Sequence, residues 1–381
     1  MIFYIVFFSV YLLGNYYIFI RGWQALPPIT GIKAIYLIIF WVLALSFIIS
    51  KFTGKQSFFA IHKITTWIGS FWLAAALYFF LFVLLIDILR LTNHFLHFFP
   101  NPDTQLYYYM KFYTFISIIA IVCISLIYGN LNARNAIIRN ISINIDKKNE
   151  KYPELKIALV SDIHLGTMVY EKYLNRLTDS INAQNPDIVL FAGDIMDEEL
   201  SPILRNDIGK PLRKLKPKLG IWAIAGNHEH IGNFSKAINY IKTLGINVLI
   251  DTSVLIDNSF YLVGRNDKDS KRFGNGNRKT LKNIAENLDK SLPIILMDHQ
   301  PANLNEAIEN EIDLQLSGHT HNGQFFPFNL ITRKVFELSY GYLQKGKTHF
   351  YVSSGFGTWG PPVRIGSKPE IVFINIRFSN N

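Results

Sequence analysis

The stretch 314–324, LQLSGHTHNGQ, places two histidines two residues apart at the end of an apolar run. The alternation over 312–316 predicts a strand, and Gly318 predicts the loop that follows it. His319 and His321 would then extend from a loop whose position is set by a strand. A single His-x-His pair is weak evidence for metal binding, because histidines also occur as hydrogen-bonded polar residues in loops. The rest of the chain decides whether this pair has partners.

Four further groups of polar residues follow apolar runs in the same way. Each contains side chains that can bind a metal: Asp162 and His164 after 155–160, Asp194 after 188–192, Asn227 and His228 after 220–225, and His299 after 293–297. In open α/β sheets ligands bind beyond the carboxyl ends of the strands, so we expect the five groups to meet. Mixed nitrogen and oxygen donors suit Mn, Fe, Zn or Co better than Mg or Ca. A closed structural zinc site is disfavoured, because the groups offer no thiolate.

The ordered set D-x-H, G-D, G-N-H-E, H and G-H-x-H resembles the calcineurin-like metallophosphoesterase superfamily, and all its blocks occur in order between 155 and 321. The C-terminal sequences GY at 341–342, VSSG at 352–355 and WGPPVR at 359–364 resemble the membrane-bound bacterial branch. The resemblance covers about two-thirds of the chain. It implies an α/β catalytic domain built as a two-sheet β-sandwich flanked by helices.

The resemblance also implies two divalent metal ions and the role of each residue. The implied metal ligands form two sets joined by one bridging carboxylate, namely Asp162, His164 and His321, then Asn227, His299 and His319, with Asp194 as the bridge. Such a pair lowers the pKa of a bound water and stabilises an in-line phosphoryl displacement.

Two further residues are expected to take part in catalysis. His228 resembles the superfamily's non-ligand histidine, which protonates the leaving oxygen or stabilises the transition state. Asp197 has the GD-x-x-D spacing of phosphoprotein phosphatases and would orient Nδ1 of His228; a solvated turn acid is the alternative. Arg265 and Arg364 are expected either to contact phosphate or to form surface salt bridges.

The first third of the chain predicts a membrane region. Its apolar runs, each close to the roughly 20 residues that cross a bilayer as a helix, are 2–20, 32–50, 64–89 and 107–128. The first run has no basic n-region and no clear cleavage site, so we interpret it as a retained helix. The expected organisation is a four-helix transmembrane region over 1–130, a linker with an edge strand over 131–154, and the catalytic domain over 155–381.

The formal charge of +10 is divided evenly, because residues 1–130 hold 7 Lys or Arg against 2 acids and the remainder 31 against 26. This distribution argues against nucleic acid as a partner. The single cysteine, Cys123, excludes a disulfide within the chain.

Four spans would place both termini on one side of a cell membrane. The basic residues expected to flank the spans on that side are Lys51, Lys55, Lys63, Arg134, Arg139, Lys147, Lys148 and Lys151. Those expected on the opposite side are Arg21, Lys33, Arg90 and Lys111. Because cytoplasmic loops carry the excess of Lys and Arg, the bias predicts a cytoplasmic catalytic domain.

These expectations combine into a membrane-anchored, dinuclear-metal phosphoesterase. Its partners would be the lipid bilayer and a phosphate ester, either a phosphodiester or a lipid-linked pyrophosphate. One alternative is a membrane sensor whose metallo-domain only binds, which the complete set of ligand residues disfavours. Another is a phosphoprotein phosphatase, which is disfavoured because Glu198 follows Asp197 without the arginine of that motif.

Overall fold

The computed structural model describes residues 2–53, 59–169 and 171–379. The chain forms two compact units, Met1–Asn130 and Leu131–Asn381. Each unit is described by itself below.

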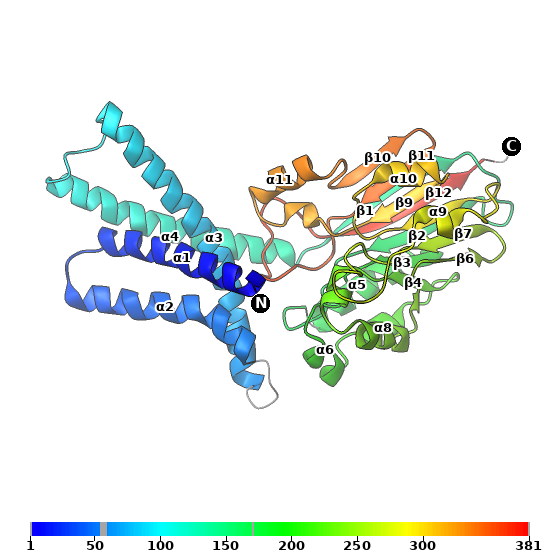
Figure 1. Ribbon diagram of the computed structural model, residues 1–381, viewed down its shortest axis with the longest axis horizontal. Coiled ribbons are helices and arrows are strands. Elements are labelled where there is room, and N and C mark those ends of the chain that lie inside the picture. Colours follow the sequence, from blue (N-terminus) through cyan, green and yellow to red (C-terminus); the bar gives the residue numbers. More distant parts are fainter. Residues whose placement is uncertain (1, 54–58, 170, 380–381) are drawn as a thin grey trace. The chain divides into compact units, whose positions relative to one another are not determined.

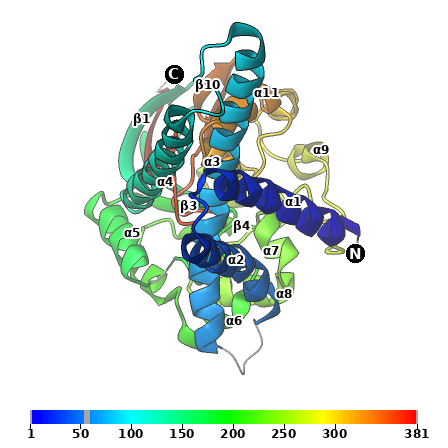
Figure 2. The same ribbon diagram turned by 90° about the vertical axis from the view of Figure 1, so that its left-hand side faces the viewer.

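The first unit is made of apolar helices. Within the described residues four helices are long and apolar enough to cross a membrane. They are α1 (Ile2–Ala25), α2 (Thr30–Phe52), α3 (Phe59–Leu96) and α4 (Gln105–Ala133), and the last turn of α4 belongs to the second unit. α3 packs against α1 and α2 (Figure 2). The helices continue beyond the apolar runs because polar residues at headgroup level still take helical backbone geometry. Lys55 lies outside the described residues.

The second unit contains two six-stranded sheets in the described part of the chain. The first sheet, in spatial order, is β1 (Ile137–Ile145), β12 (Glu370–Phe378), β2 (Glu154–Val160), β3 (Ile188–Ala192), β4 (Ile221–Ile224) and β5 (Asn247–Val248). The second is β10 (Gly341–Lys345), β11 (Thr348–Val352), β9 (Leu314–Ser317), β8 (Ile294–Met297), β7 (Phe260–Gly264) and β6 (Thr252–Ile256). β2 through β5 run parallel, as do β7, β8, β9 and β11.

The apolar core lies in three layers, because successive strand residues point to opposite faces. In β2, Leu155, Ile157 and Leu159 face the core between the two sheets, whereas Ala158 and Val160 face the helices outside. Central parallel strands are buried on both faces, which explains uninterrupted apolar sequences such as IVLFA in β3. The fold class implied by the resemblance is therefore confirmed as a two-sheet sandwich.

Helices cover both outer faces of the sandwich (Figure 1). The first sheet is covered by α5 (Glu171–Ala183), α6 (Leu200–Asn206) and α8 (Phe234–Thr243). The second is covered by α9 (Leu281–Ala285) and α10 (Leu304–Glu309). Two short helices, α7 (Asn227–Ile231) and α11 (Phe328–Val335), follow strands β4 and β9. Since the helices occupy the faces, the loops at the carboxyl ends of the strands are left to form a site.

Candidate metal centre

The five polar groups come together where the carboxyl ends of β2, β3, β4, β8 and β9 meet. Backbone hydrogen bonds join the loops in pairs: the amide of Asp162 donates to Gly193 O over 3.0 Å, and the amide of His164 donates to Asp194 O over 3.0 Å. In the second sheet, Gly318 N donates to His299 O over 3.0 Å. The candidate side chains are thus held by backbone contacts as well as by their own strands.

The backbone around the centre is strained. Five of the seven candidate ligands have positive φ: Asp162 (52°), His164 (49°), Asp194 (51°), His319 (72°) and His321 (50°). Residues other than glycine pay about 1–3 kcal/mol for such conformations, which persist where the surrounding structure holds them and cluster at functional sites.

Two glycines allow the loops to approach one another. A Cβ on Gly226 would collide with Oδ1 of Asp194, and one on Gly318 would collide with Oδ2 of Asp162. Any larger residue at either position would therefore push a carboxylate out of the centre.

One group of donor atoms contains Asp162, His164 and His321. Nε2 of His164 lies 3.0 Å from Nε2 of His321, and the latter lies 3.5 Å from Oδ1 of Asp162. Asp194 is close to the same group, with its Oδ2 3.9 Å from Nε2 of His164. All four side chains are buried. Two imidazole nitrogens and two carboxylates in this space form a donor set suited to a divalent transition metal.

The second group contains Asp194, His299 and His319. Nδ1 of His299 donates to the carbonyl oxygen of Ala192 over 2.7 Å, so Nε2 is the ring nitrogen that faces Asp194. That Nε2 lies 3.1 Å from Oδ2 of Asp194. Nδ1 of His319 likewise lies 2.9 Å from Oδ1 of Asn227. Each pair places an imidazole nitrogen beside an oxygen at a distance that a hydrogen bond or a shared cation can span.

Burial keeps three of the histidines neutral. It lowers the pKa of His164 to about 3 and that of His319 to about 4, and it holds the pKa of His321 well below the ordinary value. A histidine must be neutral to bind a metal. These three side chains are therefore in the ligand-competent state at neutral pH.

Asp194 stays charged despite its burial. Desolvation opposes the charge, but His299 and His228 hold the pKa of this carboxyl well below its ordinary value. Asp194 belongs to the second group, and its Oδ2 also lies 3.9 Å from Nε2 of His164 in the first, so it lies between the two groups as a bridging carboxylate would. The Asp and His clusters together fit a dinuclear divalent metal site.

His228 lies against the centre with a carboxylate partner. Its backbone amide donates to Oδ1 of Asp194 over 2.9 Å, and its ring Nδ1 lies 3.2 Å from Oδ1 of Asp197. Burial alone would lower the pKa of His228, but Asp194 and Asp197 raise it to about 9. These two carboxylates therefore favour the protonated ring. The ring also lies close to donor atoms of His164 and Asp194. The geometry alone is therefore compatible with two roles for His228, a proton donor and a metal ligand.

Glu229 is a structural residue of the centre to which the sequence assigned no role. Its buried carboxylate accepts backbone hydrogen bonds from Asp194 (3.1 Å), Met196 (2.8 Å) and Gly226 (2.7 Å). It thus ties the loop after β3 to the loop after β4. A signal was present in the sequence, because Glu three residues after the N-cap Gly226 matches the acidic half of a capping box.

Both arginines are buried, so neither forms the surface salt bridge that was one of the two expectations. Arg364 is fully buried and donates to the carbonyl oxygens of Ser354 (2.8 Å) and Gly357 (3.1 Å), with Nη2 3.1 Å from Nδ1 of His321. Its guanidinium holds the loop after β11 beside a candidate ligand and is not on the surface. Arg265 is also buried, 5% exposed, and pairs with Asp298 and Glu306. His321 is 43 residues from Arg364, and Asp298 and Glu306 are 33 and 41 residues from Arg265, so local sequence could not reveal these contacts.

Comparison with known proteins agrees with this arrangement. The family model described as calcineurin-like phosphoesterase matches residues 155–323. An "uncharacterized metallophosphoesterase" of Aquifex aeolicus is 34% identical over 238 residues, which cover 61% of this chain and 90% of the relative. One of Helicobacter pylori is 33% identical over 244 residues, covering 63% of each chain.

One eukaryotic relative is named as a transmembrane protein. The "transmembrane protein with metallophosphoesterase domain" of Danio rerio is 29% identical over 269 residues, covering 68% of this chain and 61% of that protein. The part of the chain that the structure describes contains four helices long and apolar enough to cross a bilayer, and together with this relative they support a membrane protein. The matched residues and the donor set make it a metal-dependent phosphoesterase. The chain belongs to the calcineurin-like phosphoesterase family.

Proposed function

We propose that this chain is a membrane-anchored dinuclear phosphoesterase that hydrolyses a phosphodiester or a lipid-linked pyrophosphate. The convergence of seven donor side chains from five strand ends is the observation that supports it. The proposed ligands are Asp162, His164 and His321 for one ion, Asn227, His299 and His319 for the other, and Asp194 for both. When bound, Mn, Fe, Zn or Co ions at these residues supply Lewis acidity and a hydroxide nucleophile near neutral pH.

The chain's own residues complete the reaction. Asp194 remains an anion and offsets the positive charge gathered in the centre. Asp197 holds Nδ1 of His228, which leaves Nε2 of that ring as the proton donor for the leaving oxygen. Asp194 and Asp197 raise the pKa of His228 and so favour the protonated form, which is the form that can donate.

The surface beside the centre supports a substrate at the membrane. We call Phe326, Phe328, Leu330, Ile331 and Val335 the α11 apolar surface, and their side chains are 51%, 40%, 49%, 54% and 68% exposed. α11 has no buried residue. A short helix with exposed Phe and Leu and with basic residues on it is typical of helices that lie in a membrane interface.

This surface adjoins the centre. α11 begins seven residues after His321, and the ring of Phe336, directly after the helix, lies 6.2 Å from the ring of His319. Arg333 and Lys334 in its last turn add positive charge that suits anionic headgroups. A lipid-linked phosphate bound by α11 would thus be presented close to the metal ligands.

The connection to the membrane helices is short. Only residues 134–136 separate the end of α4 from the start of β1. Three extended residues reach about 11 Å. The catalytic unit therefore stays within reach of the bilayer surface, which is the occupant that we assign to the α11 apolar surface.

The test compares two substrates on the full chain reconstituted in vesicles. We expect Leu330→Gln/Ile331→Gln to lose most activity on a vesicle-borne lipid-linked pyrophosphate and to keep it on water-soluble bis(p-nitrophenyl) phosphate. The reason is that the variant weakens membrane docking but leaves the donor set intact. Leu255→Gln is the matched control, because Leu255 is an exposed apolar residue (37%) on β6.

Two outcomes bear on different parts of the proposal. Equal losses on both substrates would reject the docking role of α11. Hydrolysis of neither substrate by the unsubstituted chain, with each of Mn²⁺, Fe²⁺, Zn²⁺ and Co²⁺ supplied, would reject the proposed substrate classes.

The catalytic unit is proposed to be cytoplasmic. The eight-to-four excess of Lys and Arg on its side of the spans supports this orientation, although Lys55 within that count lies outside the described residues. An alkaline phosphatase fused to the C-terminus should be inactive in the cytoplasm, and one fused after Arg21 should be active. The reverse pattern of activities would overturn the orientation.

A further inference from the structure

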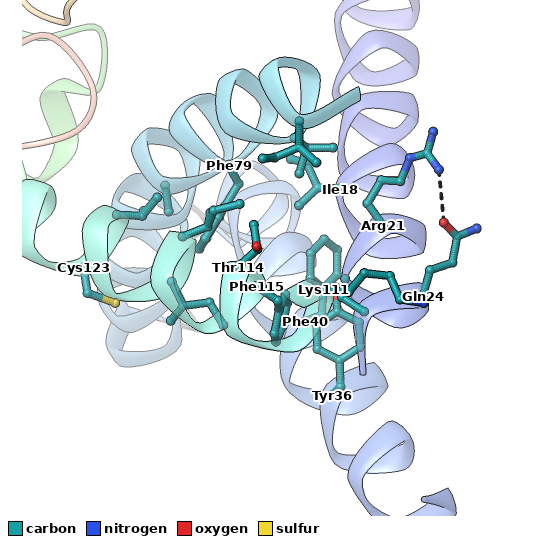
Figure 3. Close-up of a pocket in the computed structure, with 18 of the residues that line it drawn as sticks. Ile18, Arg21, Gln24, Tyr36, Phe40, Phe79, Lys111, Thr114, Phe115 and Cys123 are labelled. Carbon is teal, nitrogen blue, oxygen red and sulfur yellow. Dashed lines mark hydrogen bonds between the residues drawn. The ribbon is translucent and has the colours of Figure 1, made fainter. Parts of the chain in front are cut away.

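A large cavity lies among the helices of the first unit. Its volume is about 1300 Å³, and it is lined by all four helices. Pockets for small soluble ligands are usually about 300–1,000 Å³. In Figure 3, Arg21, Gln24 and Lys111 lie on one side of the cavity and Cys123 lies on the other. The cavity thus has a charged end and an apolar remainder.

The charged end holds more positive than negative charge. Asp87 accepts from Arg21 over 2.7 Å and from Arg90 over 3.2 Å. Among the described residues Lys111 has no carboxylate partner, and its Nζ lies 5.3 Å from the centroid of the Tyr107 ring. Nε of Arg21 is buried and has no hydrogen-bond partner within the described part of the chain. Three cations around one carboxylate leave a surplus that attracts an anion.

The cavity extends along α4 over about the depth of one bilayer leaflet. Arg21 and Arg90 lie near the ends of α1 and α3, and Lys111 lies near the start of α4, so the charges share one end of the helices. Cys123 follows Lys111 by twelve residues along α4, a rise of about 18 Å. One leaflet contributes about 15 Å of hydrocarbon, half of the roughly 30 Å core. The length of the cavity therefore matches an acyl chain.

We propose that this cavity binds an anionic glycerophospholipid. Its phosphate lies between Lys111 and Arg21, and its acyl chains lie along apolar residues such as Phe40, Phe115 and Val122. A soluble anion would leave these apolar walls unfilled, and an uncharged lipid would leave the surplus positive charge unpaired. An anionic phospholipid satisfies both ends.

The bound lipid is distinct from the substrate. The chain enters α4 at the charged end of the cavity and leaves α4 at the other end to form the catalytic unit. The proposed lipid site belongs to the first unit, whereas all the metal ligands belong to the second unit. The proposal does not depend on the proposed enzymatic function, because its test measures lipid binding and not hydrolysis.

The experiment uses the full chain purified in detergent with equal amounts of phosphatidylglycerol and phosphatidylcholine. After washing, retained lipids are counted by mass spectrometry, and we expect about one phosphatidylglycerol per chain in preference to phosphatidylcholine. Lys111→Gln should weaken this retention about fivefold, the usual contribution of one basic residue near an anionic lipid. Lys111→Arg should restore it.

Lys33→Gln is the matched control. Lys33 is a basic residue of α2 whose Nζ lies 4.9 Å from the centroid of the Trp23 ring, and it does not line the cavity. Its substitution should leave retention unchanged. Equal retention of the two lipids by the unsubstituted chain, or equal loss in Lys111→Gln and Lys33→Gln, would overturn the proposal.

The only cysteine of the chain provides a second measurement that needs no substitution. Cys123 is exposed and lines the cavity. Phosphatidylglycerol should slow its alkylation by N-ethylmaleimide relative to phosphatidylcholine. An unchanged alkylation rate would contradict occupancy of the apolar part of the cavity.

Discussion

Asp194→Asn is expected to abolish turnover and to empty both metal sites. Oδ2 of Asp194 lies near a histidine of each donor group, and the pKa of this carboxyl is held well below the ordinary value, so Asp194 is the proposed anion between the two ions. An amide of the same shape cannot supply that charge. Since residues behind metal ligands already contribute about 10–100-fold to metal affinity or activity, we expect the loss at a shared ligand to exceed 100-fold. Elemental analysis of the purified full chain measures the metal content.

Two comparisons make this result specific. His321→Ala should mainly empty one site, because His321 belongs to one donor group. Asp313→Asn should keep both metal equivalents, because Asp313 is a buried aspartate that pairs with Lys147 away from the centre. Retention of two equivalents by Asp194→Asn would contradict the shared-ligand assignment.

His228→Ala is expected to lose activity in proportion to how poor the leaving group is. A proton donor typically contributes about 10²–10⁴-fold, and an alkoxide needs that proton whereas a nitrophenolate does not. The variant should therefore lose far more on an alkyl diester than on bis(p-nitrophenyl) phosphate. Metal content should be retained, because the hydrogen bond to Asp194 is donated by the backbone amide of residue 228. The substitution leaves that amide in place.

Other outcomes for this variant have different meanings. Equal losses on both substrates would reject the acid role and leave the metal assignment standing. Loss of one metal equivalent would mean that His228 is itself a ligand, in keeping with its grouping with His164 and Asp194. His349→Gln is the control for replacing a buried histidine outside the centre.

The pH profile provides a further measurement on the same pair. The acid role requires protonated His228, so this contribution is present below the pKa of His228 and is lost as the pH rises through it. Burial opposes the raised value, and Asp194 and Asp197 support it. Asp197→Asn removes one of those anions. The basic limb of the profile should therefore move to lower pH in that variant.

The sequence alone determined the elements whose signal is local. A polar donor placed directly after an apolar run stays at the carboxyl end of its strand, so Asp162, Asp194 and His299 could be assigned to strand ends before any contact was known. The membrane helices could also be predicted, because a run of about 20 apolar residues by itself indicates a spanning helix. The fold class followed from the ordered motifs.

The tertiary structure decided what depends on distant partners. Nε2 of His164 and Nε2 of His321 are 157 residues apart in the chain and 3.0 Å apart in space. Glu229 and Arg364 are ordinary charged residues in the sequence, and they became part of the centre only through burial against its loops. The exposure of α11 and the cavity beside Lys111 likewise depend on which helix faces pack against other parts of the protein. The burial of a residue depends on contacts from all parts of the chain, so the residues around it in the sequence cannot predict it.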